Sequence, residues 1–175
     1  MELPEVLSNI GYFLGRDSLV SSVRVCRLWH QVLEPLLYRS IDRRPIPPVE
    51  ALQRHLGDIH TLSLLLEGCN TDEKDERLQQ LYLCRNLRTF ELILHKWHFR
   101  DDFPELDMIK ANRMLSSLKI TDHLSLLSRS CWDQILSESS PVLQELSLTN
   151  VRLGVDATGH LLKIAQSLLE LKLAR

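Results

Sequence analysis

The feature that most constrains this chain is a short apolar pattern that recurs in phase after residue 58. The pattern is L-x-x-L-x-L, with Ile or Phe also accepted, and its five copies begin at Ile59, Leu87, Leu115, Leu143 and Leu168. The starts are separated by 28, 28, 28 and 25 residues. One copy is common by chance in a leucine-rich chain, whereas five copies in phase indicate a repeated structural unit.

Each copy predicts a short strand, and the segments between copies predict returning helices. Side chains alternate along a strand, so the fourth and sixth positions of each copy form the inner row of a core. Helical spacing of apolar residues predicts helices over 75–84, 106–114, 130–136 and 160–166, and another over 49–56 that Gly57 terminates. In the second of these, Leu106, Ile109 and Met114 are expected to point inward. This period and pattern are typical of leucine-rich repeats, which stack into a curved, parallel α/β solenoid.

The outward positions of the predicted strands form a candidate binding surface. The third, fifth and seventh positions of each strand are expected to face outward on the concave face. The candidate contact residues among them are Thr61, Ser63, Thr89, Glu91, Ser117, Lys119, Glu145 and Ser147. This face lacks the aromatic and arginine anchors that interfaces usually carry. Better anchors follow the second strand, where Trp97, Phe99, Arg100 and Phe103 could serve a partner or, equally, the core on the convex side.

Two departures from the usual repeat are visible. The Asn or Cys that often follows the third leucine is replaced by Glu67, His95, His123 and Val151, so we expect no side-chain ladder there and irregular turns. The chain also stops directly after the fifth predicted strand, although solenoid ends need a polar cap. We therefore expect either a fragment of a longer protein or a last edge that a partner covers.

The first forty residues predict three short helices with more apolar surface than they can bury among themselves. The first stripe is Leu3, Val6, Leu7, Ile10, Phe13 and Leu14; a break at 15–18 follows, where Asp17 or Ser18 can cap a second helix with Leu19, Val20 and Val23. The third set is Val25, Cys26, Trp29, Val32, Leu33, Leu36 and Leu37. A proline-rich joint at 42–48 then separates a domain at 1–41 from one at 49–175, because prolines interrupt helices and central strands. The predicted class is α+β overall.

This helical segment resembles an F-box. The resemblance rests on Leu3-Pro4-Glu5, Ile10, Leu14, Ser18-Leu19 and Val25-Cys26-Arg27-x-Trp29, and residues 35–41 are similar to the closing segment of fungal members. It covers about the first quarter of the chain. It implies a substrate-recognition subunit of an SCF-type cullin-RING ubiquitin ligase, in which the F-box docks on a Skp-family adaptor, and through it a cullin, while the repeats bind a target protein.

The resemblance also implies which residues contact the adaptor. They are Leu3, Pro4, Val6, Leu7, Ile10, Leu14, Leu19, Val23, Val25, Cys26 and Trp29. Leu3 and Pro4 would lie at an extended start, and Trp29 near the distal end. Such a protein performs no reaction itself and needs no cofactor. The alternative is a leucine-rich-repeat scaffold without a ubiquitin-ligase role, in which the N-terminal helices only cap the solenoid.

Composition and motifs exclude several other classes. A formal net charge of −2 gives no footprint for nucleic acid, and no apolar run is long enough for a membrane span. No glycine-rich phosphate loop or nucleophile motif occurs, and His95, His98 and His123 give only weak support for a metal-dependent enzyme. The four cysteines, Cys26, Cys69, Cys84 and Cys131, are widely spaced and no export signal precedes them, so we expect reduced, mostly buried thiols in the cytoplasm or nucleus.

Overall fold

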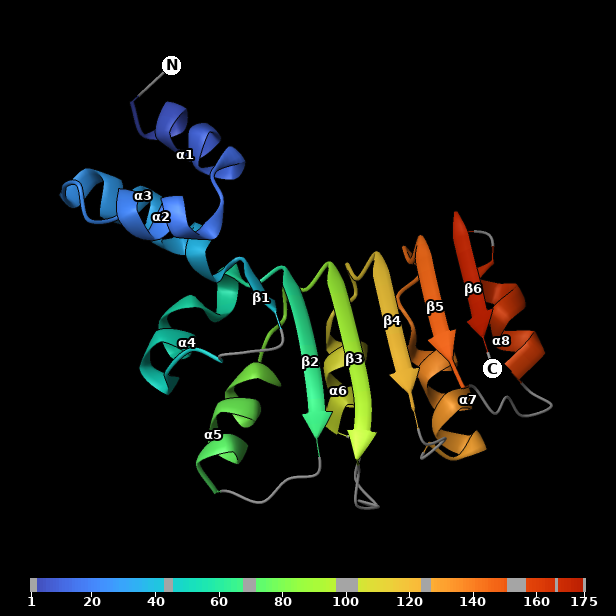
Figure 1. Ribbon diagram of the computed structural model, residues 1–175. Helices are drawn as coiled ribbons and strands as arrows, with labels where there is room; N and C mark the ends of the chain where they lie inside the picture. Colours follow the sequence, from blue (N-terminus) through green and yellow to red (C-terminus); the bar gives the residue numbers. More distant parts are fainter. Residues whose placement is uncertain are drawn as a thin grey trace.

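The computed structural model describes residues 3–42, 46–67, 72–96, 104–123, 127–150, 157–165 and 167–174. Within these residues the protein is a mixed α/β structure with eight α-helices and a six-stranded parallel sheet in the order β1-β2-β3-β4-β5-β6 (Figure 1). Three helices come first: α1 (Leu3–Phe13), α2 (Arg16–Ser22) and α3 (Arg27–Tyr38). We call these three helices the head.

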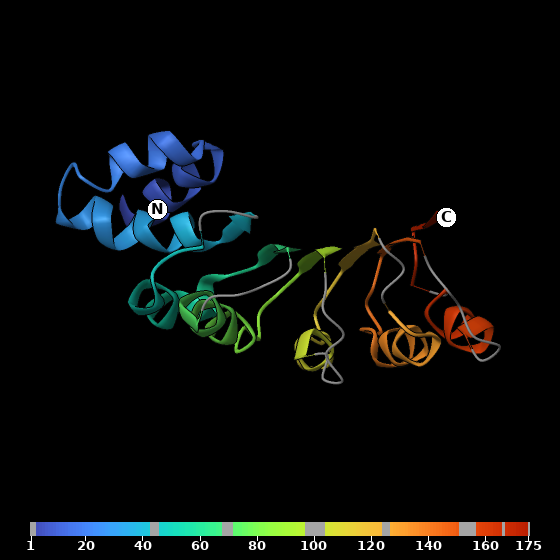
Figure 2. The same ribbon diagram turned by 60° about the horizontal axis from the view of Figure 1, so that its bottom comes forward.

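The remaining elements form the sheet unit. Its strands are β1 (Ser40–Asp42), β2 (Thr61–Glu67), β3 (Thr89–Lys96), β4 (Ser117–Asp122), β5 (Glu145–Thr149) and β6 (Glu170–Ala174). Its helices are α4 (Val49–His55), followed by the 3-10 turn η1 (Leu56–Asp58), α5 (Asp72–Leu81), α6 (Pro104–Ala111), α7 (Arg129–Glu138) and α8 (Ala157–Ile164). Helices α4 to α8 lie on one face of the sheet, and the head lies beyond β1 (Figure 2). We call the opposite face of the sheet the open face.

The strand register follows the period of the sequence pattern. Thr61 pairs with Thr89, Thr89 with Ser117, Ser117 with Glu145, and Glu145 with Glu170. Equivalent positions of successive copies therefore lie side by side in rows that run across the sheet. The predicted parallel sheet with helices between its strands is confirmed.

The predicted core rows are also confirmed through β5. The first, fourth and sixth positions of the first four copies are at most 1% exposed: Ile59, Leu62, Leu64, Leu87, Phe90, Leu92, Leu115, Leu118, Ile120, Leu143, Leu146 and Leu148. In β6 the equivalent Leu171 and Leu173 are 47% and 48% exposed. Among the described residues, no further strand lies beside them to complete the row.

Helix α4 begins at Val49 as predicted, whereas α5 to α8 begin earlier than the apolar pattern predicted. Helix α6 begins at Pro104, since proline suits the first turn of a helix, where its missing N–H is not needed. Its buried face carries Leu106, Met108 and Ile109, whereas Met114 lies beyond the helix and is 66% exposed, so its predicted inward position was wrong. Likewise, α4 ends at His55, and Gly57 lies within η1 instead of capping the helix.

A sixth strand was not predicted. Ser40, Ile41 and Asp42 pair with Thr61, Leu62 and Ser63 of β2, and Ile41 is buried in the core of the sheet. Strand β1 has three residues and none of the repeated pattern, so no periodicity predicts it. The predicted domain boundary between residues 41 and 42 falls inside this strand.

Side-chain hydrogen bonds connect neighbouring repeats at the turns that precede the strands. Asn112 is buried; its Oδ1 accepts from the Leu87 amide at 2.8 Å, and its Nδ2 donates to the carbonyls of Cys84 and Met108 at 2.9 and 2.7 Å. One repeat further on, the Ser140 hydroxyl donates to the Arg113 carbonyl at 2.6 Å. The turns that follow the strands, for which no side-chain ladder was expected, lie largely outside the described residues, so that expectation stays a prediction.

The head is held together by a small interior. Its buried apolar side chains are Leu7, Leu19 and Leu33, and α1 approaches α3 closely at Gly11. A Cβ at Gly11 would overlap the Cδ1 of Leu36 and lie 2.7 Å from the Cδ2 of Leu33. Close packing at a glycine thus brings the two helices together.

Two local predictions in the head were wrong. Helix α1 begins at Leu3, so Leu3 and Pro4 form its first turn instead of an extended start. Gly15 occupies the N-cap position of α2 without a side-chain hydrogen bond, and Asp17 lies in the first turn, where an acidic side chain suits the helix dipole.

Candidate functional site

The head carries a group of exposed apolar side chains, which we call the head surface. Its members are Leu3, Ile10, Tyr12, Phe13, Val20 and Val25, and their exposed fractions range from 36% for Val20 to 90% for Phe13. Three helices of this length have too few inward positions to bury them, since only Leu7, Leu19 and Leu33 reach the interior. The head thus exposes more large apolar side chains than it buries.

The structure divides the predicted adaptor contacts into three groups. Leu3, Pro4, Ile10, Val25 and Cys26 are exposed, and Val6, Leu14, Val23 and Trp29 are partly exposed. Leu7 and Leu19 are 3% and 6% exposed, so their prediction as contact residues is corrected. They pack the three helices against one another, because they lie on the inner side of the stripe.

Three members of the head surface were not among the predicted contacts. Phe13 was counted in the apolar stripe of the first helix, and Val20 in the second helix, but neither was assigned to the surface. Tyr12 was not singled out at all; its ring lies 4.4 Å from the Arg39 guanidinium, in a cation–π contact. The available signal was Tyr12-Phe13, two adjacent aromatic residues at the end of an amphipathic helix.

The described cysteines differ in how far they are buried. Cys84 is buried, and burial raises the pKa of its thiol from 9.0 to about 11, with the positive charge of Arg85 acting weakly in the opposite direction. Cys131 is partly exposed, whereas Cys26 is exposed in front of α3, so the expected burial of its thiol was wrong. Cys69 lies outside the described residues.

The open face carries the predicted polar positions, and hydrogen bonds connect many of them. Ser63 donates to the Glu91 carboxylate at 2.5 Å, and Ser117 donates to the Glu145 carboxylate at 2.6 Å. Lys119 forms an ion pair with Glu145 at 2.8 Å. These bonds join neighbouring strands, because the partners occupy the same or adjacent rows.

The remaining predicted positions of this face, Thr61, Thr89 and Ser147, are partly exposed on the same side. The hydrogen bonds from Lys119 and Ser117 lower the pKa of the Glu145 carboxyl despite its partial burial. At the far edge, Glu170 and Lys172 form an ion pair at 2.5 Å, and that hydrogen bond raises the pKa of Lys172. The charged groups of the open face therefore largely neutralise one another.

A cluster around His55 joins the head to the sheet unit. The His55 ring stacks on Tyr38 with centroids 4.2 Å apart, and its Nδ1 lies 2.9 Å from the Asp58 carboxylate. Glu34 of α3 lies 3.6 Å from His55 Nε2 and 3.3 Å from His30 Nδ1. Helix α3 thus contacts α4 through the Tyr38 ring and the Glu34 carboxylate, and Asp58 of η1 contacts the same His55 ring.

The histidines proposed as weak metal ligands are only partly brought together. The ring of His95 in β3 and that of His123, which directly follows β4, have centroids 5.2 Å apart, while His98 lies outside the described residues. In the part of the chain that the structure describes, no three His, Cys, Asp or Glu side chains converge as a metal site would require. The anchor candidates Trp97, Phe99, Arg100 and Phe103 also lie outside it.

No protein-family model matches the chain, and no curated protein matches it either. Among the described residues, no helix has both the length and the apolar character needed to cross a bilayer.

Proposed function

We propose that this protein is the substrate-recognition subunit of an SCF-type cullin-RING ubiquitin ligase. In this proposal the head is an F-box that docks on a Skp-family adaptor, and the sheet unit is a leucine-rich-repeat domain that holds a target protein. The observation that carries the proposal is the exposed head surface, with Phe13 90% and Val25 63% exposed. The protein performs no chemistry; it raises the effective concentration of the target near a ubiquitin-charged enzyme.

The exposed apolar side chains of the head favour a partner that removes them from water. Burying one large apolar side chain contributes about 1.5–3 kcal/mol, and exposed apolar patches on small proteins mark interaction sites. The exposed members of the head surface lie in α1, in α2 and in the turn before α3. The F-box resemblance, which uses Leu3, Ile10 and Val25 of this surface, supports a Skp-family adaptor as that partner.

The sheet unit supports the second half of the proposal. Five in-phase copies of the apolar pattern lie in register in a parallel sheet, with helices on one face and a polar open face on the other. This arrangement supports a leucine-rich-repeat solenoid of about five repeats. Its open face offers hydroxyl and charged side chains in rows, which suit a polar protein surface.

One observation favours a second function, the repeat scaffold without a ubiquitin-ligase role. The chain of the head continues directly into β1, and the His55 cluster attaches α3 to α4 and η1. A head attached in this way can cap the first edge of the sheet and needs no further partner. The two functions differ in whether the head surface binds an adaptor.

Co-expression with a Skp-family adaptor tests the proposal. The wild-type chain should co-purify in a one-to-one complex, and Phe13→Asp combined with Val25→Asp should reduce capture at least about tenfold, because two apolar contacts are replaced by charges. Met114→Asp is the matched control, since Met114 is similarly exposed but lies on the sheet unit. A well-folded chain that captures no adaptor would refute the F-box role and leave the scaffold.

A further inference from the structure

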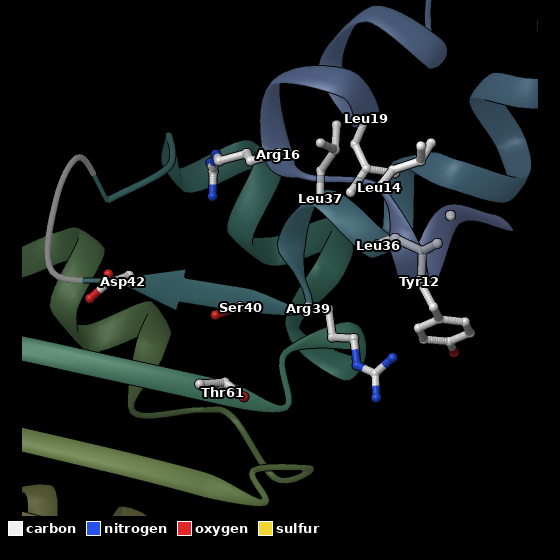
Figure 3. Close-up of a pocket in the computed structure, with 11 residues that line it drawn as sticks. Tyr12, Leu14, Arg16, Leu19, Leu36, Leu37, Arg39, Ser40, Asp42 and Thr61 are labelled. Carbon is white, nitrogen blue, oxygen red and sulfur yellow. The ribbon is translucent and has the colours of Figure 1, made fainter. Parts of the chain in front are cut away.

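A cavity of about 450 Å³ lies where the head meets the first edge of the sheet (Figure 3). The ends of α1 and α3 contribute an apolar wall that includes Leu14, Leu36 and Leu37. The opposite side is polar, with Ser40 of β1 and Thr61 of β2. The volume falls within the range of small-ligand pockets, about 300–1,000 Å³, and accommodates one or two bulky side chains.

Two arginines also line this cavity, and neither is neutralised by the described residues. The Arg39 guanidinium lies over the Tyr12 ring at 4.4 Å, a contact that occupies its face and leaves its in-plane N–H groups able to donate. Arg16 is exposed and makes no hydrogen bond or ion pair with the described part of the chain. Asp42 lines the end away from Arg39 and Tyr12 (Figure 3), so positive charge dominates beside the apolar wall.

The cavity is continuous with the open face of the sheet. Ser40 pairs with Thr61, and Asp42 with Ser63, so β1 extends the polar rows of the open face up to the head. Further along the face, Lys119 is paired with Glu145, and Lys172 with Glu170. A chain lying along the open face therefore meets its available cationic groups at this cavity.

We infer that the cavity binds a segment of a target protein in which a bulky apolar side chain stands beside an aspartate or glutamate. The apolar side chain packs against Leu36 and Leu37, and the carboxylate accepts hydrogen bonds from Arg39, whose planar donors match a carboxylate. Thr61 and Ser40 offer hydroxyls to the backbone of the segment. As a description of the target, this inference rests on the proposed function.

Short peptides test the inference on the full chain. The probes are two blocked hexapeptides, GSFDSG and GSFNSG, titrated into the isotopically labelled protein while the amide signals of residues around the cavity are followed by NMR. The aspartyl peptide should bind at least about fivefold more tightly than the asparaginyl peptide, because it alone offers a carboxylate to arginine. Equal binding of the two peptides, or no binding of either, would overturn the inference, as would equal shifts from acetate alone.

Two substitutions test whether Arg39 causes the preference for the aspartyl peptide. Arg39→Gln should weaken binding of the aspartyl peptide about tenfold and make the two peptides equivalent, the change expected for loss of one charge-assisted contact. Arg113→Gln is the matched control, since Arg113 is exposed but does not line the cavity, and it should bind the peptides as the wild type does. Unchanged discrimination in Arg39→Gln would contradict the assignment.

Adaptor capture, measured on the same proteins, separates this inference from the proposed function. Arg39→Gln should retain adaptor capture, because it leaves Phe13 and Val25 unchanged and alters the head surface only through its contact with Tyr12. If the adaptor is captured and the peptides do not bind, the cavity inference fails alone. If the peptides bind selectively and no adaptor is captured, the cavity stands as a peptide site of a repeat scaffold, and the ubiquitin-ligase role fails.

Discussion

Similar apolar side chains are buried in the centre of the sheet unit and exposed on the head. Phe90 in β3 is 1% exposed, whereas Phe13 at the end of α1 is 90% exposed. In the sheet, each core position is covered by the neighbouring strands and by a helix, so every repeat completes the core of the one before it. In the head, three short helices have no such neighbour, and their outer apolar residues remain on the surface. Whether an apolar side chain is buried thus depends on the strands and helices packed around it, and not on how apolar its segment is.

The largest expected effect is the contrast between two identical substitutions. Phe90→Ala should lower the free energy of unfolding by about 3–5 kcal/mol, because it leaves a cavity in the sheet core. Phe13→Ala should change it by less than about 0.5 kcal/mol, since the Phe13 ring is 90% exposed. Urea unfolding followed by circular dichroism measures both values. Similar losses in the two variants would show that Phe13 is buried in solution and that the head surface does not exist.

A smaller loss is expected where a polar side chain connects two repeats. Asn112→Ala should cost about 2–4 kcal/mol, because the Leu87 amide and the Cys84 carbonyl lose their buried partner. Asn86→Ala is the matched control: Asn86 makes one exposed hydrogen bond, to the Gly57 carbonyl, and its removal should cost less than about 1 kcal/mol. Equal costs in urea unfolding would argue that the Asn112 contacts are not formed.

Thiol labelling compares the two regions without any substitution. Cys26 in the head is exposed, while Cys84 in the sheet unit is buried, with its pKa raised to about 11. Because the thiolate is the reactive form, iodoacetamide at pH 8 should modify Cys26 at least about a hundredfold faster than Cys84. Peptide mass spectrometry follows each site, and labelling in urea provides the control in which the two rates converge. Rapid labelling of Cys84 in the native protein would show that the sheet core opens readily.

The smallest expected effect is a pH dependence on the open face. The pKa of Glu145 is lowered in the folded protein, mainly by Lys119 and Ser117, so its contribution to stability is present above its unfolded value, near 4.5, and is lost as pH falls through the folded pKa. Glu145→Gln should therefore be less stable than the wild type at pH 7, by about 1 kcal/mol or less, with the difference vanishing in acid.

Lys119→Met is the control for this pH dependence, because it removes the ion-pair partner that lowers the pKa of Glu145 most. In that background, Glu145→Gln should have a smaller effect at pH 7 than in the wild type. Thermal unfolding between pH 2.5 and 7 measures each pair of proteins. An equal difference at every pH would mean that the Lys119–Glu145 ion pair does not form.

Much of the sheet unit could be predicted from the sequence because the same apolar pattern recurs in each copy. Leu62, Leu118 and Leu146 occupy equivalent positions, and each copy supports the interpretation of the others. Strand β1 was missed because three residues carry no period. The hydrogen bonds of Asn112 were missed because Asn112 lies before the repeated pattern and not within it. The available signal was the spacing: Cys84, Asn112 and Ser140 each lie three residues before a copy of the pattern.

The head was less predictable for a physical reason. A stripe on a short helix shows which residues are apolar, but its division between interior and surface depends on how closely the helices approach. Gly11 brings α1 against α3, which buries Leu7 and leaves Phe13 outside. The cavity beside Arg39 and Tyr12 depends on the placement of the head beside β1, which no local pattern contains.

The central claim is that the head surface is an apolar docking face for a Skp-family adaptor. Isothermal titration calorimetry with the purified adaptor at several temperatures tests it most directly, because burial of apolar surface gives a negative heat-capacity change of binding. The account predicts one-to-one binding with a clearly negative heat-capacity change, and loss of that binding in the Phe13→Asp, Val25→Asp double variant. Absence of binding, or binding whose heat capacity and affinity are unchanged in the double variant, would contradict it.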